Sequence, residues 1–224
     1  MPTIDGRAPS LAPSLREAFD RASAADARVR VNAQEPIYAS GDEDESMYLI
    51  ESGQVKVSMA SAGGKDCLIA IYTKGELFGE SCFTAGPKRF ETATAMQPTI
   101  VRRVPRRDFI AAVERLRVTD ALVQHVATRL SDRQWAVFDL VTMPSERRLA
   151  KVLLEMAEKL GTRETVYLRV DPKISHEELS QMVGTTRPRI TAFMQKFRKL
   201  GLLETAGRTI IVNHPKLAQF VGEE

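Results

Sequence analysis

One short segment near the carboxyl end constrains the fold of this chain more than any other. Ser175 is followed three residues later by Glu178, a capping-box pair that predicts the start of a helix. Gly184 predicts the end of that helix, because glycine readily adopts the left-handed backbone found after a helix. Thr186 is placed to cap a second helix, and Pro188 is tolerated in its first turn. The segment therefore predicts two short helices joined by a tight turn.

The residues around Gly184 also predict how the two helices pack. Ser180 lies four residues before the glycine, where two crossed helices need a close approach. Apolar residues occupy the positions at which the helices of a helix-turn-helix contact each other: Leu179, Val183, Ile190 and Phe193. Each feature is common alone, but their combination around one glycine turn indicates a helix-turn-helix.

Positive charge is concentrated on the second predicted helix and just beyond it. Between residues 185 and 208 there is one acidic residue, Glu204. The same segment contains six cationic residues: Arg187, Arg189, Lys196, Arg198, Lys199 and Arg208. A charge run is usually a solvated surface, but on this helix neutralisation of DNA phosphates is the better interpretation. Residues 202–204 and 209–212 predict a two-stranded wing, with Arg208 at its tip placed to meet a phosphate.

The first turn of the second helix is the predicted base-reading element, because recognition helices place their N-terminal residues at base edges. Arg187 or Arg189 suits guanine, since a guanidinium donates two hydrogen bonds to O6 and N7. Lys196, further along the helix, is expected on the phosphate backbone. The candidate residues for binding duplex DNA are Ser175, Thr185, Thr186, Arg187, Arg189, Ile190, Lys196 and Arg208.

The amino-terminal half has a different texture, with short apolar runs broken by turn residues from Glu35 to about Val104. A short helix is expected at 15–25, after a loose arm. Among the later runs, 47–51 and 54–59 are joined across Ser52-Gly53. Regularly spaced short strands with glycine turns predict an antiparallel sandwich or barrel.

Thr119 to Thr142 predicts one long helix with a near-heptad apolar stripe. The stripe consists of Leu122, Val126, Leu130, Val137 and Val141. The helix either packs on its own β-domain or forms the seam of a homodimer. The length of the stripe favours the homodimer, because one small barrel offers little surface to cover so many turns.

Met143-Pro144-Ser145 ends this helix, since proline disfavours helical geometry in the residue before it. Ser145 is expected to cap the next helix, 146–160. We place a domain boundary at this break.

The residue inventory excludes several classes of protein. The net charge of +3 means that any basic surface must be local. Two cysteines, Cys67 and Cys82, are too few for a disulfide framework or a four-thiolate cluster, which leaves a redox thiol as an alternative. No nucleophile motif, metal-ligand cluster or Walker loop predicts an enzyme. With no signal-peptide pattern and no membrane-length apolar run, we expect a cytoplasmic protein.

The order of β-roll, long helix and winged helix-turn-helix resembles the cyclic-AMP receptor/FNR (Crp-Fnr) family of bacterial transcription regulators. The likeness runs from about Glu35 to His214, and its marks are Gly41-Asp42, 47–50 with Gly53, Phe78-Gly79-Glu80 and the helix-turn-helix. The resemblance implies an α+β fold: an arm and short helix (1–30), a double-stranded β-helix effector domain (31–116), a dimerisation helix (117–143) and a winged helix-turn-helix (144–224). It also implies a homodimer that binds palindromic operators and contacts RNA polymerase.

Cyclic-nucleotide binders of this family hold their ligand in a cassette between two strands. The resemblance implies that Glu80 contacts the ribose 2′-hydroxyl and that Arg89 grips the cyclic phosphate. The cassette departs after the arginine, where Phe90 replaces a hydroxyl residue and Glu91 adds a carboxylate that would repel a phosphate unless it points away. The candidate effector residues are Gly79, Glu80, Ser81, Arg89, Phe90, Arg133 and Gln134.

Three interpretations of the effector stay open: cyclic AMP, another anionic or nucleotide-like ligand, or no ligand at all. In the last case the protein is constitutive, and Glu80 and Arg89 pair with other residues. Haem sensing needs an axial ligand, and the three histidines, His125, His176 and His214, lie outside the β-domain. A bound effector is expected to contact the long helix near Arg133 and to rotate the DNA-binding domains about 143–145.

The second helix also departs from the cyclic-AMP receptor pattern. Arg187 matches the first arginine of that pattern, whereas Pro188 and Ala192 replace two base-reading residues. We therefore expect an operator different from the usual one. A ligand-binding module without DNA function is the remaining alternative, and such a module would lack the winged helix.

Overall fold

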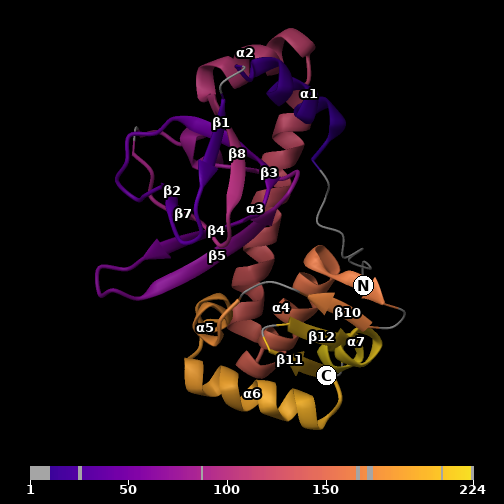
Figure 1. Cartoon of the computed structure of the whole chain (residues 1–224). Coiled ribbons are helices and arrows are strands. Elements are labelled where there is room, and N and C mark those ends of the chain that lie inside the picture. Colours follow the sequence, from indigo (N-terminus) through magenta and orange to yellow (C-terminus); the bar gives the residue numbers. More distant parts are fainter. Residues whose placement is uncertain are drawn as a thin grey trace. The chain divides into compact units, whose positions relative to one another are not determined.

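A computed structural model describes residues 11–24, 27–86, 88–164, 167–170, 174–207 and 209–222 (Figure 1). The chain divides into two compact units, one ending at Arg133 and one beginning at Gln134. The division falls inside helix α3 (Thr119–Thr142), earlier than the break at Pro144 where the sequence placed it. Each unit is described by itself.

The amino-terminal unit is built on two four-stranded antiparallel sheets, with strand orders β1-β8-β3-β6 and β2-β7-β4-β5. Alternate residues of β4 point inward, so Val55 and Val57 are buried. The strands are β1 (Arg28–Val31), β2 (Pro36–Tyr38), β3 (Ser46–Ser52), β4 (Gln54–Ala60), β5 (Asp66–Thr73), β6 (Leu77–Phe78), β7 (Thr92–Ala95) and β8 (Thr99–Pro105). This is the predicted β-roll.

The strands expected in this unit are all present, and three others in it were not anticipated. β1 begins at Arg28, inside the segment expected to be an arm, and pairs with β8. β6 has two residues, and β7 reads Thr-Ala-Thr-Ala. β1 has four residues that alternate Arg and Val, β6 is too short to show a periodicity, and β7 has only small side chains, so pairing with neighbours decides their structure.

Helices cover one end of the β-roll, where α1 (Pro13–Ala22) and α2 (Arg106–Leu116) lie side by side (Figure 1). Their contact is aromatic, with the ring centroids of Phe19 and Phe109 6.0 Å apart. Both rings belong to a core that also contains Met47 and Leu49 of β3. A single 3-10 turn, η1 (Glu80–Phe83), follows β6.

The carboxy-terminal unit combines helices with a third antiparallel sheet of order β11-β12-β10-β9. Its core joins residues of every helix that follows α3 to the sheet, among them Leu149, Leu179, Ile190 and Leu217. The helices are α4 (Ser145–Leu160), α5 (His176–Val183), α6 (Arg187–Lys199) and α7 (His214–Gly222), and the strands are β9 (Thr162–Glu164), β10 (Tyr167–Val170), β11 (Leu203–Ala206) and β12 (Thr209–Asn213).

The helix-turn-helix forms as the sequence predicts. The Glu178 amide donates to the Ser175 hydroxyl (3.1 Å), and the Ser175 amide donates to the Glu178 carboxylate (2.9 Å), which completes the capping box. Gly184 ends α5 with a φ of 68°, a left-handed value that favours glycine. The expected cap at Ser145 is wrong: α4 begins at Ser145 itself, after Pro144, with no side-chain cap.

Within the described ranges, no helix is long and apolar enough to cross a membrane.

Candidate nucleic-acid interface and effector site

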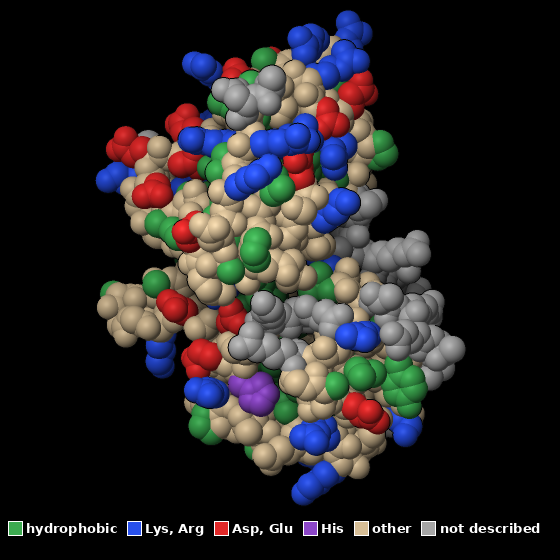
Figure 2. Space-filling view, in the orientation of Figure 1, with side chains coloured by type: hydrophobic (Ala, Val, Ile, Leu, Met, Phe, Trp, Pro, Cys, Tyr) green, Lys and Arg blue, Asp and Glu red, His purple; other side chains and the backbone are tan. Residues whose placement is uncertain are grey.

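Helix α6 has one buried face and one exposed face. Ile190, Met194 and Phe197 recur at helical spacing and point into the core of the unit. The expected base contact by Ile190 is therefore wrong, because this side chain is fully buried. The exposed residues of α6 are Arg187, Pro188, Arg189, Ala192, Gln195, Lys196, Arg198 and Lys199. Figure 2 shows Lys and Arg side chains along the edge of the molecule where Figure 1 places α6.

The two arginines of the first turn differ in their surroundings. The Arg187 side chain has no hydrogen-bond or ion-pair partner within the described part of the chain and is exposed. The guanidinium carbon of Arg189 lies 5.7 Å from the centroid of the Phe193 ring, in a cation–π contact. Arg187 is thus the arginine whose donors are free for a base or phosphate.

The hydroxyl residues before α6 also differ. Thr186 is the N-cap of α6 but makes no side-chain cap bond, and it is exposed. The Thr185 hydroxyl oxygen is buried and has no hydrogen-bond partner among the described residues. The Ser175 hydroxyl is held in the capping box. Of these three hydroxyls, that of Thr186 is the one most available to DNA.

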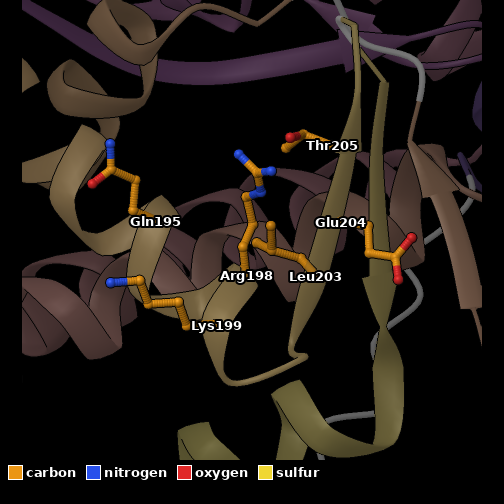
Figure 3. Close-up of a pocket in the computed structure, with 6 residues that line it drawn as sticks. All are labelled: Gln195, Arg198, Lys199, Leu203, Glu204 and Thr205. Carbon is orange, nitrogen blue, oxygen red and sulfur yellow. The ribbon is translucent and has the colours of Figure 1, made fainter.

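The far end of α6 adjoins the wing. Lys196 is paired with Glu146 of α4 (Nζ to Oε1, 2.8 Å), so part of its charge is neutralised within the unit. An open hollow of about 650 Å³ separates α6 from β11 and is lined by Gln195, Arg198, Lys199, Leu203, Glu204 and Thr205 (Figure 3). Arg208, expected at the wing tip, lies outside the described residues.

Arg89, the cassette arginine of the β-roll, is buried and hydrogen-bonded, in contrast to the exposed Arg187 of α6. Arg89 is 1% exposed in its side chain, and its Nε and Nη2 donate to Asp44 Oδ2 at 3.1 and 2.7 Å. Its Nη1 donates to the Gly79 carbonyl and the Ser81 hydroxyl, both at 2.7 Å, and Nη2 also donates to the Ser46 carbonyl. A guanidinium carries five N–H donors. All five are used within the chain, so as arranged the cassette does not fit a cyclic phosphate.

Asp44 is the carboxylate that balances this buried charge. Its Oδ1 accepts from Arg103 (2.8 Å), and its Oδ2 also accepts from the Tyr48 hydroxyl (3.1 Å). Burial raises the pKa of the Asp44 carboxyl, but hydrogen bonds from Arg89 and Ser46 and the charges of Arg89 and Arg103 outweigh it, so its pKa lies below the ordinary value. Asp44 is therefore ionised and fully engaged.

Gly79 contributes backbone to this arrangement. Its φ is 93°, and a Cβ there would lie 2.9 Å from the Ser46 carbonyl oxygen. Only glycine lets this turn approach β3 closely enough for both carbonyls to reach the Arg89 guanidinium.

Glu80, expected on a ribose hydroxyl, is paired with helix α3. Its Oε1 lies 3.0 Å from Nε2 of His125 and 3.4 Å from Nε of Arg129. Burial raises the pKa of Glu80, but the hydrogen bond from His125 and the charge of Arg129 lower it by more. The pKa of this carboxyl therefore lies below its usual value. This carboxylate too has partners from its own chain.

Glu91 does not point away from the cassette. Its Oε1 accepts hydrogen bonds from the Tyr38 hydroxyl and the Ser81 hydroxyl, both at 2.9 Å. Ser81 thus links Arg89 to a second carboxylate, while Phe90 is about half exposed and faces outward. A carboxylate within the cassette opposes the binding of any anion there.

Aromatic rings fill the space between the two sheets of the β-roll. The Phe78 ring stacks on Tyr48 and Tyr72, with centroids 5.1 and 6.1 Å away, and burial raises the pKa of Tyr72 to about 12. The guanidinium of Arg89 lies 4.2 Å from the Tyr38 ring centroid, and that of Arg129 lies 4.5 Å from the Tyr72 centroid. The cassette arginine and Arg129 of α3 thus each lie against an aromatic ring of the β-roll.

Arg133 of helix α3 contacts residues of strand β5 in the β-roll. Arg133 donates to the Ile69 carbonyl (2.6 Å), and its Nη2 lies 3.4 Å from the Tyr72 hydroxyl. Gln134 is exposed and begins the other unit. The sequence reading missed His125 and Arg129, although both precede Arg133 at helical spacing. Asp44 had no comparable signal, because nothing local shows which acid of a four-residue acidic turn points inward.

The apolar stripe of α3 remains exposed, and none of the described α3 residues is buried. Leu122 packs against the α1–α2 core instead, whereas Val123, which the sequence reading left out, is exposed. The exposed fractions are 61% for Val123, 42% for Val126, 58% for Leu130, 61% for Val137 and 80% for Val141. Apolar side chains exposed in a row on one helix indicate an interaction surface.

Two other chemistries find little support. Cys82 is buried, and burial raises the pKa of its thiol to about 12, which disfavours the thiolate that redox chemistry requires. Cys67 is exposed. In the described part of the chain, no three His, Cys, Asp or Glu side chains gather as metal ligands.

The similarities to known proteins follow the same division. Residues 28–115 match the cyclic nucleotide-binding domain, and residues 147–220 match the Crp-like helix-turn-helix domain. The chain is 29% identical over 180 residues to the CRP-like cAMP-activated global transcriptional regulator of Mycobacterium tuberculosis, covering 79% of this chain and 80% of that one. It is 26% identical over 183 residues to the global nitrogen regulator of Synechococcus elongatus, covering 80% and 82%.

The structure of FixK2 from Bradyrhizobium japonicum has the same fold, with a TM-score of 0.76 at 22% identity over 86% of this chain and 95% of that one. Both matched domains occur here in one chain and in the predicted order, and the Mycobacterium tuberculosis relative is a transcriptional regulator. This chain belongs to the Crp-Fnr family of DNA-binding transcription regulators.

Proposed function

We propose that this protein binds a palindromic operator as a homodimer, with helix α6 of each subunit in the major groove. The single observation that carries this proposal is the exposed face of α6, on which Arg187 keeps its donors free. The exposed stripe of α3 supplies the pairing surface. Two-fold symmetry then predicts half-sites about one helical turn apart, roughly 34 Å. Contact with RNA polymerase completes the proposal, as the family membership implies.

We further propose that the protein works with its β-roll closed on its own side chains and needs no small-molecule effector. The saturation of all five Arg89 donors supports this constitutive mode. An entering phosphate would have to displace Asp44 from Arg89 and leave that carboxylate with only Arg103 and Tyr48 as partners. Such displacement is unfavourable, because removing one member of a buried ion pair typically destabilises a protein by about 3–5 kcal/mol.

Control by a cyclic nucleotide is the second candidate. The match of residues 28–115 to the cyclic nucleotide-binding domain favours it, as do relatives described as cAMP-activated. In that case Glu80 and Arg89 would exchange their internal partners for ribose and phosphate. The two candidates therefore make opposite predictions about whether the purified protein binds a cyclic nucleotide.

Calorimetric titration of the full-length protein with cyclic AMP, cyclic GMP and 2-oxoglutarate separates them. We expect no saturable heat and no change in thermal midpoint, because a ligand that prefers the native state must stabilise it. Operator binding should be equally tight with and without each compound. Saturable binding that also tightens the operator complex would establish the second candidate instead.

The operator itself comes from selection of random duplexes with full-length protein. We expect the selected sites to be inverted repeats. Binding of every duplex with equal affinity would contradict sequence-specific regulation.

A further inference from the structure

The first half of the exposed face of α6 carries two small apolar residues among its cations. Pro188 and Ala192 lie one turn apart and are both exposed. They face away from the core, because the intervening Ile190 and the following Met194 are buried. The first two turns of the face thus present a pyrrolidine ring and a methyl group.

One polar group beside these two residues is engaged within the unit. The Thr191 hydroxyl donates to the Arg187 carbonyl (3.1 Å) and lies 2.9 Å from Nδ1 of His176. Exposed polar side chains flank the pair along the helix: Arg187 and Arg189 on either side of Pro188, and Gln195 and Lys196 after Ala192, with Gln195 at the hollow beside β11 (Figure 3). The start of the exposed face therefore mixes arginines with two small apolar side chains.

We infer that Pro188 and Ala192 are specificity-determining residues that read the C5 methyl groups of thymines in each half-site. The inference rests on the proposed placement of α6 in the major groove. In that groove thymine alone among the four bases presents a methyl group, and small apolar side chains are its natural contacts. Neither residue can donate or accept a side-chain hydrogen bond, so neither can select guanine, adenine or cytosine by that means.

The spacing suits two thymines. Residues one turn apart on a helix have Cβ atoms about 5–6 Å apart, and bases along one strand rise about 3.4 Å per step. The two side chains therefore reach methyl groups one to two base steps apart. Arg187, at the start of the helix, anchors the register by contacting a guanine or a phosphate beside them.

The test is a double-mutant cycle between protein and DNA. In the selected operator, each thymine of a half-site is replaced singly by deoxyuridine, which removes the methyl and nothing else. We expect one or two positions at which this change weakens binding of full-length protein about fourfold, the effect of exposing one apolar carbon group. Replacement outside the half-sites is the matched DNA control.

The protein side of the cycle uses Ala192→Gly and, independently, Pro188→Ala. Ala192→Gly should lose the deoxyuridine penalty at one position, and Pro188→Ala, which keeps a single methyl group in place of the ring, should reduce it at the other. Lys199→Ala, at the end of the same helix, should keep both penalties. Thermal melting establishes that each variant is folded, and Pro188→Ala retains a good helix former if the glycine variant is unstable.

Three results would overturn the inference: no penalty at any thymine of a specifically bound operator, penalties unchanged in both variants, or selected half-sites without thymine at adjacent or next-but-one positions. The first two would leave the proposed function intact. Failure of the wild-type protein to bind any selected duplex would remove the proposed function and the inference together.

Discussion

The interior of the β-roll and the outward faces of α3 and α6 carry the same kinds of residue in opposite states. Arg89 is buried and has all its donors satisfied, whereas Arg187 is exposed and has none satisfied within the described chain. Aromatic rings stack on one another inside the roll, whereas Leu130 and Val137 lie open along α3. The side chains whose partners lie in the same chain are inside the β-roll, and those without such partners among the described residues lie on the surfaces proposed for DNA and for the dimer.

The largest effect on stability should come from breaking the buried ion pair between Arg89 and Asp44 in the β-roll. Asp44→Ala leaves the Arg89 guanidinium buried without its carboxylate and should lower the free energy of unfolding by about 3–5 kcal/mol. Urea denaturation of the full chain measures it. Asp66→Ala, at an exposed position of β5, is the matched control and should change stability little. Equal losses in the two variants would show that the ion pair contributes nothing specific.

The dependence of stability on acid pH tests the same ion pair. The pKa of Asp44 is lower in the folded protein than its value of about 3.9 in an unfolded chain. Its contribution to stability is therefore complete above that unfolded value and is lost as the pH falls through the folded pKa. Asp44→Asn should flatten the acid limb of the stability profile, and an unchanged limb would assign the acid sensitivity to other carboxylates.

The next largest effect should be on dimerisation, through the exposed apolar stripe of α3. Leu130→Asp puts a charge into the proposed seam and should weaken dimerisation about 100-fold or more, since each buried leucine contributes about 1.5–3 kcal/mol and two are lost per dimer. Sedimentation equilibrium measures the association. Gln124→Asp, exposed on a different side of α3, is the control. A Leu130→Asp protein that stays dimeric would place the seam elsewhere.

At α6 the two arginines of the first turn can be compared directly. Arg187→Ala should weaken binding to the selected operator about 10- to 100-fold while reducing non-specific binding much less, as expected for loss of a base contact. Arg189→Ala should have the smaller effect, because its guanidinium already lies against Phe193. Competition binding at fixed salt tests both. Equal losses on specific and random DNA would assign Arg187 to the phosphate backbone.

The smallest effect separates the two hydroxyl residues at the helix starts. Ser175→Ala removes a formed capping box and should destabilise the carboxy-terminal unit by about 1 kcal/mol. Thr186→Ala removes no cap bond and should alter stability less, yet weaken DNA binding more. Denaturation and binding curves for the two variants form the check. The reverse order of effects would mean that Thr186 acts as an ordinary cap.

The features that were predictable from sequence depend on neighbours along the chain. The capping box, the glycine after α5, the long α3 and the larger strands all follow from local spacing and turn chemistry. Strands β1, β6 and β7 were missed because each is defined by a partner distant in sequence. Ile190 was misassigned because its place in the first turn of α6 suggested exposure, while its helical phase put it in the core.

By itself, the sequence determined the order of β-roll, long helix and winged helix-turn-helix, the family, and the set of charged residues available to each site. Only the tertiary structure decided which of those charges are free. Asp44 lies forty-five residues from Arg89, and Glu80 meets His125 from a separate helix. Pairing of this kind depends on which side chains the fold buries together, because a buried charge requires a partner whereas an exposed one does not. The same arginine chemistry therefore closes the β-roll and leaves α6 open to DNA.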